Sequence, residues 1–396
     1  MTNDNVDIII RGAGLSGISL LLALTEQGYS GNVLVVEKRA KPETQKTWCF
    51  WGEQNISSSL HHLIKRRWFS WSFSNGRQEY HHCTQSNEHA YCCLQAEDFY
   101  RYAFDKLKGL PTIEWLWNTD SELINSVDAN AHADTHADTQ ASANSVELAL
   151  NGRRVSASFG FDSACGISLP EGNTINQYFV GAWVKTSTHS FNAKKAALMS
   201  NMTADESCFE FTYILPFDAD YALIELTRFS MRDESLADMQ SACEKIVNNG
   251  DYGNDVVIEK WEKGVLSMDT RIAPVKVGNW NCIGARGSMI RASSGYAFLT
   301  IQRWAEKTAQ SLCSENKLSL AKPISPLYSA LDSLFLKVMR KNMALSPTLF
   351  NAMAKNVGAD VFARFMTESA TFSDVLSIIK AMPIRPFVKA LFTPEH

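Results

Sequence analysis

Residues 8–17 read IIIRGAGLSG, and this stretch decides the fold of the chain. The isoleucines indicate a short buried strand over Asp7–Arg11, and an apolar helix is predicted over Ile18–Gln27. Between them, glycines at positions 12, 14 and 17 give the pattern GxGxxG. In such a turn the first glycine permits a sharp bend, the second admits a pyrophosphate close to the backbone, and the third lets helix and strand pack closely. The motif therefore predicts a dinucleotide site, with phosphate at the helix N-terminus.

An acidic residue at the end of the next strand supports this prediction. A strand is expected over Asn32–Val36, and Glu37 follows it, twenty residues beyond Gly17. In dinucleotide-binding βαβ units, an acid at this spacing accepts a hydrogen bond from a ribose hydroxyl. The motif alone does not separate FAD from NAD. The candidate cofactor-binding residues of this unit are Gly12, Ala13, Gly14, Leu15, Ser16, Gly17, Glu37 and Lys38.

The composition limits the functional classes. Of the 396 residues, 45% are apolar and 20% are charged, which indicates a folded globular chain. Its length fits two or three domains, or one large domain with an inserted second lobe. The net charge of −4 argues against nucleic acid as a partner. Nine dispersed cysteines with no CxxC pair predict neither a disulfide framework nor a zinc site. We assign His132 and His136 to a solvated loop rather than to a metal site.

No segment predicts export or a membrane span. The N-terminus MTNDNVDIII has no basic region or cleavage site, and no uninterrupted apolar run approaches the length of about 18 residues that a spanning helix needs. We expect a cytoplasmic location, which still permits peripheral contact with the inner face of the membrane. The basic run Lys65–Arg67 before Trp68 fits either contact with anionic lipid or a solvated turn before a strand.

The remainder of the chain shows a β-rich middle and a helical end. Strands are expected over Trp68–Ser74, Thr112–Trp117, Val146–Leu150 and Cys208–Leu215, and we assign them to a second sheet. The run GARGSM at 284–289 leads into a helix over 299–312, which predicts a second glycine-rich turn that faces the first. Two glycine-rich turns around a β-rich middle favour FAD, because distant segments then cover one cofactor.

The predicted units follow from these patterns. An FAD-binding domain begins at 1–75 and finishes at 271–325. Residues 76–270 mix this domain with a β-sheet substrate domain and include an exposed loop at 125–146, and residues 326–396 form a helical subdomain.

Five short motifs, in chain order, resemble one family. KTWCF at 46–50 is similar to its His-Thr-Trp-Ser-Phe, QYFVG at 177–181 to Gln-x-Phe-Leu-Gly, and YILP at 213–216 to Tyr-Val-Leu-Pro. IELT at 224–227 resembles Leu-Glu-Glu-Thr, and GSMIRASSGYAF at 287–298 resembles GGMxxPSTGYxF. The chain resembles the FAD-dependent lycopene cyclases of the bacterial β-cyclase type, as a divergent member, and the likeness reaches the helical C-terminus.

The resemblance implies an α/β fold of the glutathione-reductase type: a Rossmann-like FAD-binding domain, an inserted β-sheet substrate domain and a helical end. It also implies redox-neutral, acid-initiated cyclisation of the end group of an acyclic polyene such as lycopene. Reduced FAD is the implied cofactor, NADPH its reductant, and the membrane the source of the polyene. The further cofactor-binding residues it implies are Trp48, Gly284, Gly287, Met289 and Gly295.

Glu225 is the candidate catalytic acid. In the strand YALIELTRF, alternation places Glu225 on the same face as Leu223, Thr227 and Phe229. A carboxyl group in a dry apolar cavity has a raised pKa and stays protonated near neutral pH. The alternative is a glutamate that faces solvent.

Departures from the family pattern bear on the substrate and the chemistry. Leu226 replaces the neighbouring acid of the family, so a paired carboxylate is expected to be absent. Ala164 stands in place of an arginine in an Asp-Ser-Arg segment, and Ala292 in place of a proline. Two other functions stay open: a flavin monooxygenase or halogenase, against which Gly284-Ala285 in place of a Gly-Asp pair counts, and a non-catalytic polyene-binding relative.

Overall fold

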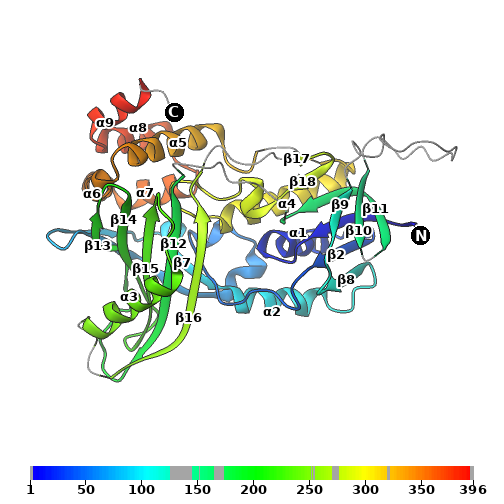
Figure 1. Cartoon of the computed structure of the whole chain (residues 1–396), viewed down its shortest axis with the longest axis horizontal. Coiled ribbons are helices and arrows are strands. Elements are labelled where there is room, and N and C mark those ends of the chain that lie inside the picture. Colours follow the sequence, from blue (N-terminus) through cyan, green and yellow to red (C-terminus); the bar gives the residue numbers. More distant parts are fainter. Residues whose placement is uncertain are drawn as a thin grey trace.

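The structure is a computed structural model that describes residues 3–124, 145–150, 152–164, 174–250, 252, 255–269, 276–318 and 322–392. Most of the expected loop at 125–146, including His132 and His136, lies outside these ranges. Two large sheets lie along the long axis of the molecule, and the C-terminal helices cover one end (Figure 1).

The first sheet contains the predicted strand, turn and helix. β1 (Asn3–Arg11) runs into α1 (Leu15–Glu26) and returns as β2 (Val33–Glu37), which pairs with β1 in parallel. The strand order is β17-β18-β11-β1-β2-β8, and β10 and β9 extend from β11. The other bounds in this sheet are β8 (Ile113–Trp117), β9 (Glu122–Ile124), β10 (Val146–Leu150), β11 (Arg153–Asp162), β17 (Lys276–Val277) and β18 (Trp280–Cys282).

The run of isoleucines fills both faces of this sheet. Ile8 and Ile10 pack into the cluster with α1, whereas Ile9 packs on the other face with Val146 and Trp280. A strand buried on both sides needs apolar residues at successive positions, which is why the sequence does not alternate there. α1, α2 (Ala96–Leu107) and α4 (Phe298–Glu315) share the first of these clusters.

Two expected strands were assigned to the wrong sheet. Ile113–Trp117 and Val146–Leu150 belong to the first sheet, because β8 pairs in parallel with β2 and β10 pairs with β11. An alternating pattern shows which face of a strand is buried but not which strand is its neighbour. Lys65–Arg67 was also expected before a strand and lies instead within β4.

The second sheet has seven strands in the order β16-β12-β15-β14-β13-β5-β6. α3 (Leu236–Asn249) packs on one face, against Val180, Ile224 and Leu226. A smaller sheet, β3-β7-β4, lies beside it. The bounds are β3 (Thr47–Trp51), β4 (Ile64–Trp68), β5 (Ser70–Ser74), β6 (Glu79–Cys83), β7 (Tyr91–Gln95), β12 (Asn176–Thr186), β13 (Lys195–Ala204), β14 (Cys208–Pro216), β15 (Tyr221–Ser230) and β16 (Val256–Ser267).

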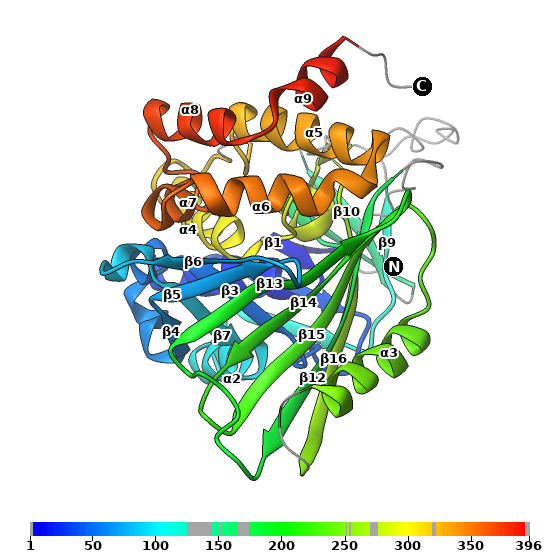
Figure 2. The ribbon, with the colours of Figure 1, turned by 90° about the vertical axis from the view of Figure 1, so that its left-hand side faces the viewer.

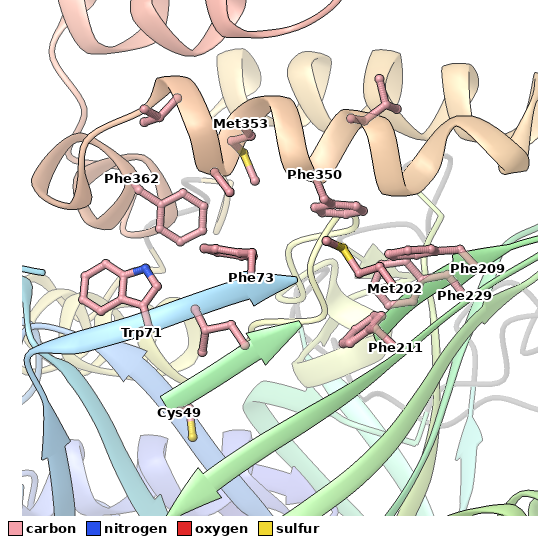
Figure 3. Packing of buried hydrophobic residues seen from close by; sticks show 14 of the residues in the cluster. Cys49, Trp71, Phe73, Met202, Phe209, Phe211, Phe229, Phe350, Met353 and Phe362 are labelled. Carbon is pink, nitrogen blue, oxygen red and sulfur yellow. The ribbon is translucent and has the colours of Figure 1, made fainter. Parts of the chain in front are cut away.

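The C-terminal helices cover the opposite face of the second sheet, with α8 and α9 outermost (Figure 2). Their bounds are α5 (Pro326–Lys341), α6 (Ser346–Asn356), α7 (Ala359–Met366), α8 (Phe372–Ala381) and α9 (Ile384–Leu391). Aromatic side chains from both layers meet between them. Phe350 of α6 stacks on Phe209 of β14, and Phe362 of α7 packs on Phe73 of β5 (Figure 3).

A buried ion pair joins the second glycine-rich segment to the helical layer. The Arg291 guanidinium donates two hydrogen bonds of 2.9 Å to Asp332 of α5, and both side chains are almost fully buried. Ser293 also donates to Asp332, at 2.8 Å. The pair therefore fixes α5 relative to the segment that leads into α4.

We expect Asp332→Ala to lower the free energy of unfolding by about 3–5 kcal/mol, because it leaves the Arg291 charge buried and unpaired. Denaturant unfolding of the purified protein measures this value. The double variant Arg291→Met, Asp332→Leu should lose less than Asp332→Ala alone, and a single variant as stable as the wild type would contradict the argument.

Candidate active site

One cavity joins the first glycine-rich turn to the helical layer. Its volume is about 790 Å³. Its lining runs from Gly14 and Leu15 past Trp48 of β3 and Glu225 of β15 to residues of α8 and α9. Aromatic and aliphatic side chains supply most of the wall. They include Phe73, Phe179, Phe211, Leu223, Phe229, Tyr296, Phe298, Phe335, Phe350 and Phe362.

The three glycines of the first turn have different structural roles, as the motif predicts. Gly12 has φ +104°, which favours glycine, and a methyl group at Gly17 would lie 2.2 Å from the Gly12 oxygen. A methyl group at Gly14 would meet no atom within 4 Å and would occupy cavity space. Gly14 also precedes α1 without a side-chain cap, so backbone N–H groups of the first helical turn remain for a ligand. Ala13, Ser16 and Gly17 are buried in the turn.

Glu37 is held in place by the turn and by a residue that the sequence did not identify. Its carboxylate accepts a 2.8 Å bond from the Ala13 N–H and a 2.9 Å bond from Arg39 Nε. Burial acts to raise the pKa of Glu37, but the hydrogen bonds from Arg39 and Ala13 hold it below its usual value. Arg39 lines the cavity beside Gly14, whereas Lys38 is exposed and outside the described lining.

The second glycine-rich turn packs against the first, as expected. A methyl group at Gly284 would lie 2.8 Å from Ser16 Oγ, and the Gly284 N–H donates to the sulfur of buried Met289. Gly287 is also buried. Gly284 therefore joins the two turns, and Gly287 and Met289 pack within the second turn. Gly295 and Trp48 line the cavity.

Two polar groups near Gly295 have no partner among the described residues. Gln177 Oε1 and Ser294 Oγ are buried without a hydrogen bond, and both residues line the cavity. Gly295 has φ +74°, which favours glycine, and a methyl group there would lie 2.4 Å from Gln177 Oε1. Buried polar atoms are normally paired, so this wall is suited to a ligand that carries polar groups.

The second acid is the largest difference from the sequence analysis. Glu225 of β15 and Glu262 of β16 both pair in register with Gly181 of the strand between them, β12. Because Gly181 has no side chain, the two carboxyl groups face each other across it. A methyl group there would lie 3.1 Å from Glu262 Cγ and 3.4 Å from Glu225 Cβ. Both glutamates are buried and line the cavity.

The expected absence of a paired carboxylate was therefore wrong. Leu226, which replaces the second acid of the motif, packs on the opposite face of β15 against α3. An acid at position 226 would point away from the cavity. The sequence did not identify Glu262 as a candidate, because its neighbours Glu259, Lys260 and Lys263 form a charged run that is typical of a solvated strand.

Burial makes Glu225 a weak acid. The residue is 8% exposed. Burial is the larger cause and the nearby charge of Glu262 is the second cause that raises the pKa of Glu225 to about 8. A 2.8 Å hydrogen bond from Thr227 and the charge of Lys46 oppose this rise. Burial also raises the pKa of Glu262, which accepts hydrogen bonds from Thr47 Oγ1 at 2.6 Å and Trp183 Nε1 at 3.2 Å. The alternative of a solvent-facing Glu225 is excluded.

Three tyrosine hydroxyls extend this row of polar groups. Tyr213 of β14 is the register partner of Glu225. The Tyr91 hydroxyl lies 2.6 Å from that of Tyr213 and 2.7 Å from that of Tyr296. Burial raises the pKa of all three, so they remain neutral hydroxyls in the cavity wall.

A family model described as lycopene cyclase protein matches residues 7–392, nearly the whole chain. This chain belongs to the lycopene cyclase family. No curated protein matches it significantly.

Solved structures place this family member among flavoproteins in fold. A geranylgeranyl bacteriochlorophyll reductase-like protein from Thermoplasma acidophilum aligns with a TM-score of 0.60 at 10% identity, covering 98% of this chain and 99% of that one. A flavoprotein/dehydrogenase from Cytophaga hutchinsonii aligns with a TM-score of 0.57 at 10% identity, covering 95% of this chain and 99% of that one. pqsL of Pseudomonas aeruginosa, a probable FAD-dependent monooxygenase, aligns with a TM-score of 0.52 at 14% identity. The alignment covers 95% of this chain and 100% of that one. The expected α/β fold is confirmed.

The residues of this cyclase-family chain fit FAD, the cofactor that family and fold support. Gly14 leaves room for a pyrophosphate at the N-terminus of α1, and Arg39 lines the same cavity. Glu37 accepts a hydrogen bond from the Ala13 N–H of the turn. Gln177 and Ser294 offer unpaired polar groups further along the same cavity.

We expect Gly14→Ala to weaken FAD binding by about tenfold or more, a loss of about 1.4 kcal/mol, because its methyl group occupies the space of the phosphates. Its backbone has φ −79° and ψ −173°, which alanine adopts freely, so the thermal midpoint without FAD should not change.

Gly17→Ala is the matched comparison. It should lower the thermal midpoint, because its methyl group meets backbone. Quenching of flavin fluorescence measures affinity, and wild-type affinity in Gly14→Ala would contradict this assignment.

Proposed function

We propose that this protein is a flavin-dependent, redox-neutral cyclase that closes a ring at the end of an acyclic polyene such as lycopene. The observation that carries the proposal is a buried carboxyl group, Glu225, with its pKa raised to about 8 in an apolar cavity that also reaches Gly14. An acid of this kind keeps its proton at neutral pH and gives it only to a group held against it.

The proposed reaction begins with proton transfer from Glu225. The proton adds to a terminal carbon–carbon double bond of the polyene and leaves a tertiary carbocation. The next double bond attacks this cation, and the new carbon–carbon bond closes the ring. A ring carbon then loses a proton to the carboxyl pair, which is one proton short after the first step. Product and substrate have the same mass, and no electrons are transferred.

Glu262 supports this chemistry by its charge and its position. Thr47 and Trp183 donate hydrogen bonds to it, so its carboxyl group stays beside Glu225 across Gly181. A negative charge there opposes ionisation of Glu225 before the reaction and stabilises a nearby carbocation during it.

The cavity wall protects the cation. Aromatic rings such as Phe211, Phe229 and Tyr296 present polarisable faces and exclude water that would trap the intermediate. Reduced FAD, when bound, supplies an electron-rich ring system that stabilises positive charge or relays a proton. NADPH is the proposed reductant of the flavin.

The assay that tests this proposal contains purified protein, FAD, a chemical reductant and lycopene in detergent, without oxygen. We expect a product of unchanged mass that forms only with reduced flavin. Glu225→Gln should lower turnover by about a hundredfold or more, the usual contribution of a general acid. Chromatography with mass detection measures the product.

The dependence of turnover on pH is a second test of Glu225 as the acid. Because the protonated form reacts, wild-type turnover should fall as pH rises through about 8. Glu262→Gln removes the neighbouring negative charge and should move this fall to lower pH.

Glu210→Gln, on the neighbouring strand β14 and outside the described cavity lining, is the control and should keep wild-type turnover. A product heavier by oxygen in air would identify a monooxygenase instead. Binding of lycopene without any conversion would identify a carrier.

A further inference from the structure

Large apolar side chains are exposed mainly on two helices. The described residues contain eleven such side chains, and seven of them lie between Phe372 and Phe392. We call this surface the α8–α9 face. Its members, with their exposed fractions, are Phe372 (80%), Leu376 (37%), Ile379 (47%), Ile384 (65%), Val388 (45%), Leu391 (62%) and Phe392 (85%).

The α8–α9 face is also the mouth of the cavity. Ile379, Ile384, Val388 and Leu391 line the cavity and are each nearly half exposed or more. The same side chains therefore meet the interior and the outside. Both helices are the outermost layer of the molecule at this end (Figure 2).

The exposed charged side chains within the segment Phe372–Phe392 have one sign. Lys380, Arg385 and Lys389 lie between its apolar residues and are exposed. The single acid of the segment, Asp374, is buried, caps α8 and is paired with Arg364 at 2.8 Å. The segment is thus basic in a chain whose net charge is −4.

We propose that the α8–α9 face docks on an anionic lipid bilayer, so that the cavity opens into the acyl region. Short amphipathic helices with apolar and basic side chains bind in this way, with the apolar side chains below the headgroups and the cations among them. No described helix is long and apolar enough to cross a bilayer, so the contact is interfacial. The docking stands by itself, and only the delivery of a polyene through the mouth rests on the proposed function.

Lipid fits this face better than a second copy of the chain does. Two copies joined at the α8–α9 face would bring like charges together and would close the cavity mouth. An anionic lipid surface instead neutralises Lys380 and Arg385.

The basic run Lys65–Arg67 has other partners. Lys65 pairs with Asp98 at 2.9 Å, Arg66 donates to the Ala193 carbonyl at 2.7 Å, and Arg67 donates to Glu53 at 2.7 Å. The structure therefore favours the α8–α9 face over this run as the lipid contact.

Flotation of the full chain with vesicles tests the proposal. The vesicles contain either phosphatidylcholine alone or equal parts of phosphatidylcholine and phosphatidylglycerol. We expect the wild type to float with the anionic vesicles. Ile384→Ser with Leu391→Ser should weaken this binding by about tenfold or more, because two large apolar side chains no longer enter the bilayer. Arg385→Glu should also weaken it, with a smaller effect at high salt.

The control double variant Phe69→Ser, Val257→Ser removes two exposed apolar side chains outside the α8–α9 face and should float like the wild type. A wild type that does not bind anionic vesicles would overturn the proposal, and so would an α8–α9 variant that binds as well as the control. A wild-type dimer in gel filtration that the α8–α9 variant loses would assign the face to a second copy instead. Flotation needs no turnover, so failure of the cyclase proposal would not alter these readings.

Discussion

The proposed chemistry depends on the approach of two carboxyl groups across a residue without a side chain. Gly181 separates Glu225 from Glu262 on three adjacent strands, and neither glutamate is free in solvent. Two buried carboxylates at such a site cannot both ionise easily, so one keeps its proton near neutral pH. The sheet thereby positions a carboxyl group that can act as a proton donor.

The layers of the fold make this acid useful. The second sheet supplies the carboxyl pair, the first glycine-rich turn leaves open space at Gly14 before α1, and side chains of α5, α6 and α7 line the cavity between them. The Arg291–Asp332 pair fixes the helical layer to the segment that ends at α4. A cofactor and an apolar substrate can then occupy one continuous space that opens at α8 and α9.

Local patterns in the sequence predicted local structure well. The GxGxxG run predicted β1, the turn, α1 and β2 because the strand, turn and helix are adjacent in the chain. Alternation around Glu225 predicted its apolar face, and the structure places Leu223, Thr227 and Phe229 in the same cavity wall. The pairing of strands that are far apart in the sequence could not be predicted from it. The sheet of β8 and β10, and the meeting of Glu262 with Glu225, depend on which strands become neighbours, and no residue spacing records that choice.

The central claim is that Glu225 carries a proton at neutral pH because of its burial and its neighbour. Infrared spectroscopy of the carboxyl C=O stretch tests it most directly, by the difference between the wild type and Glu225→Gln. The account predicts a protonated carboxyl band in the wild type at neutral pH that is absent from the variant and is lost as pH rises through about 8. A difference spectrum with no protonated band at neutral pH would contradict it.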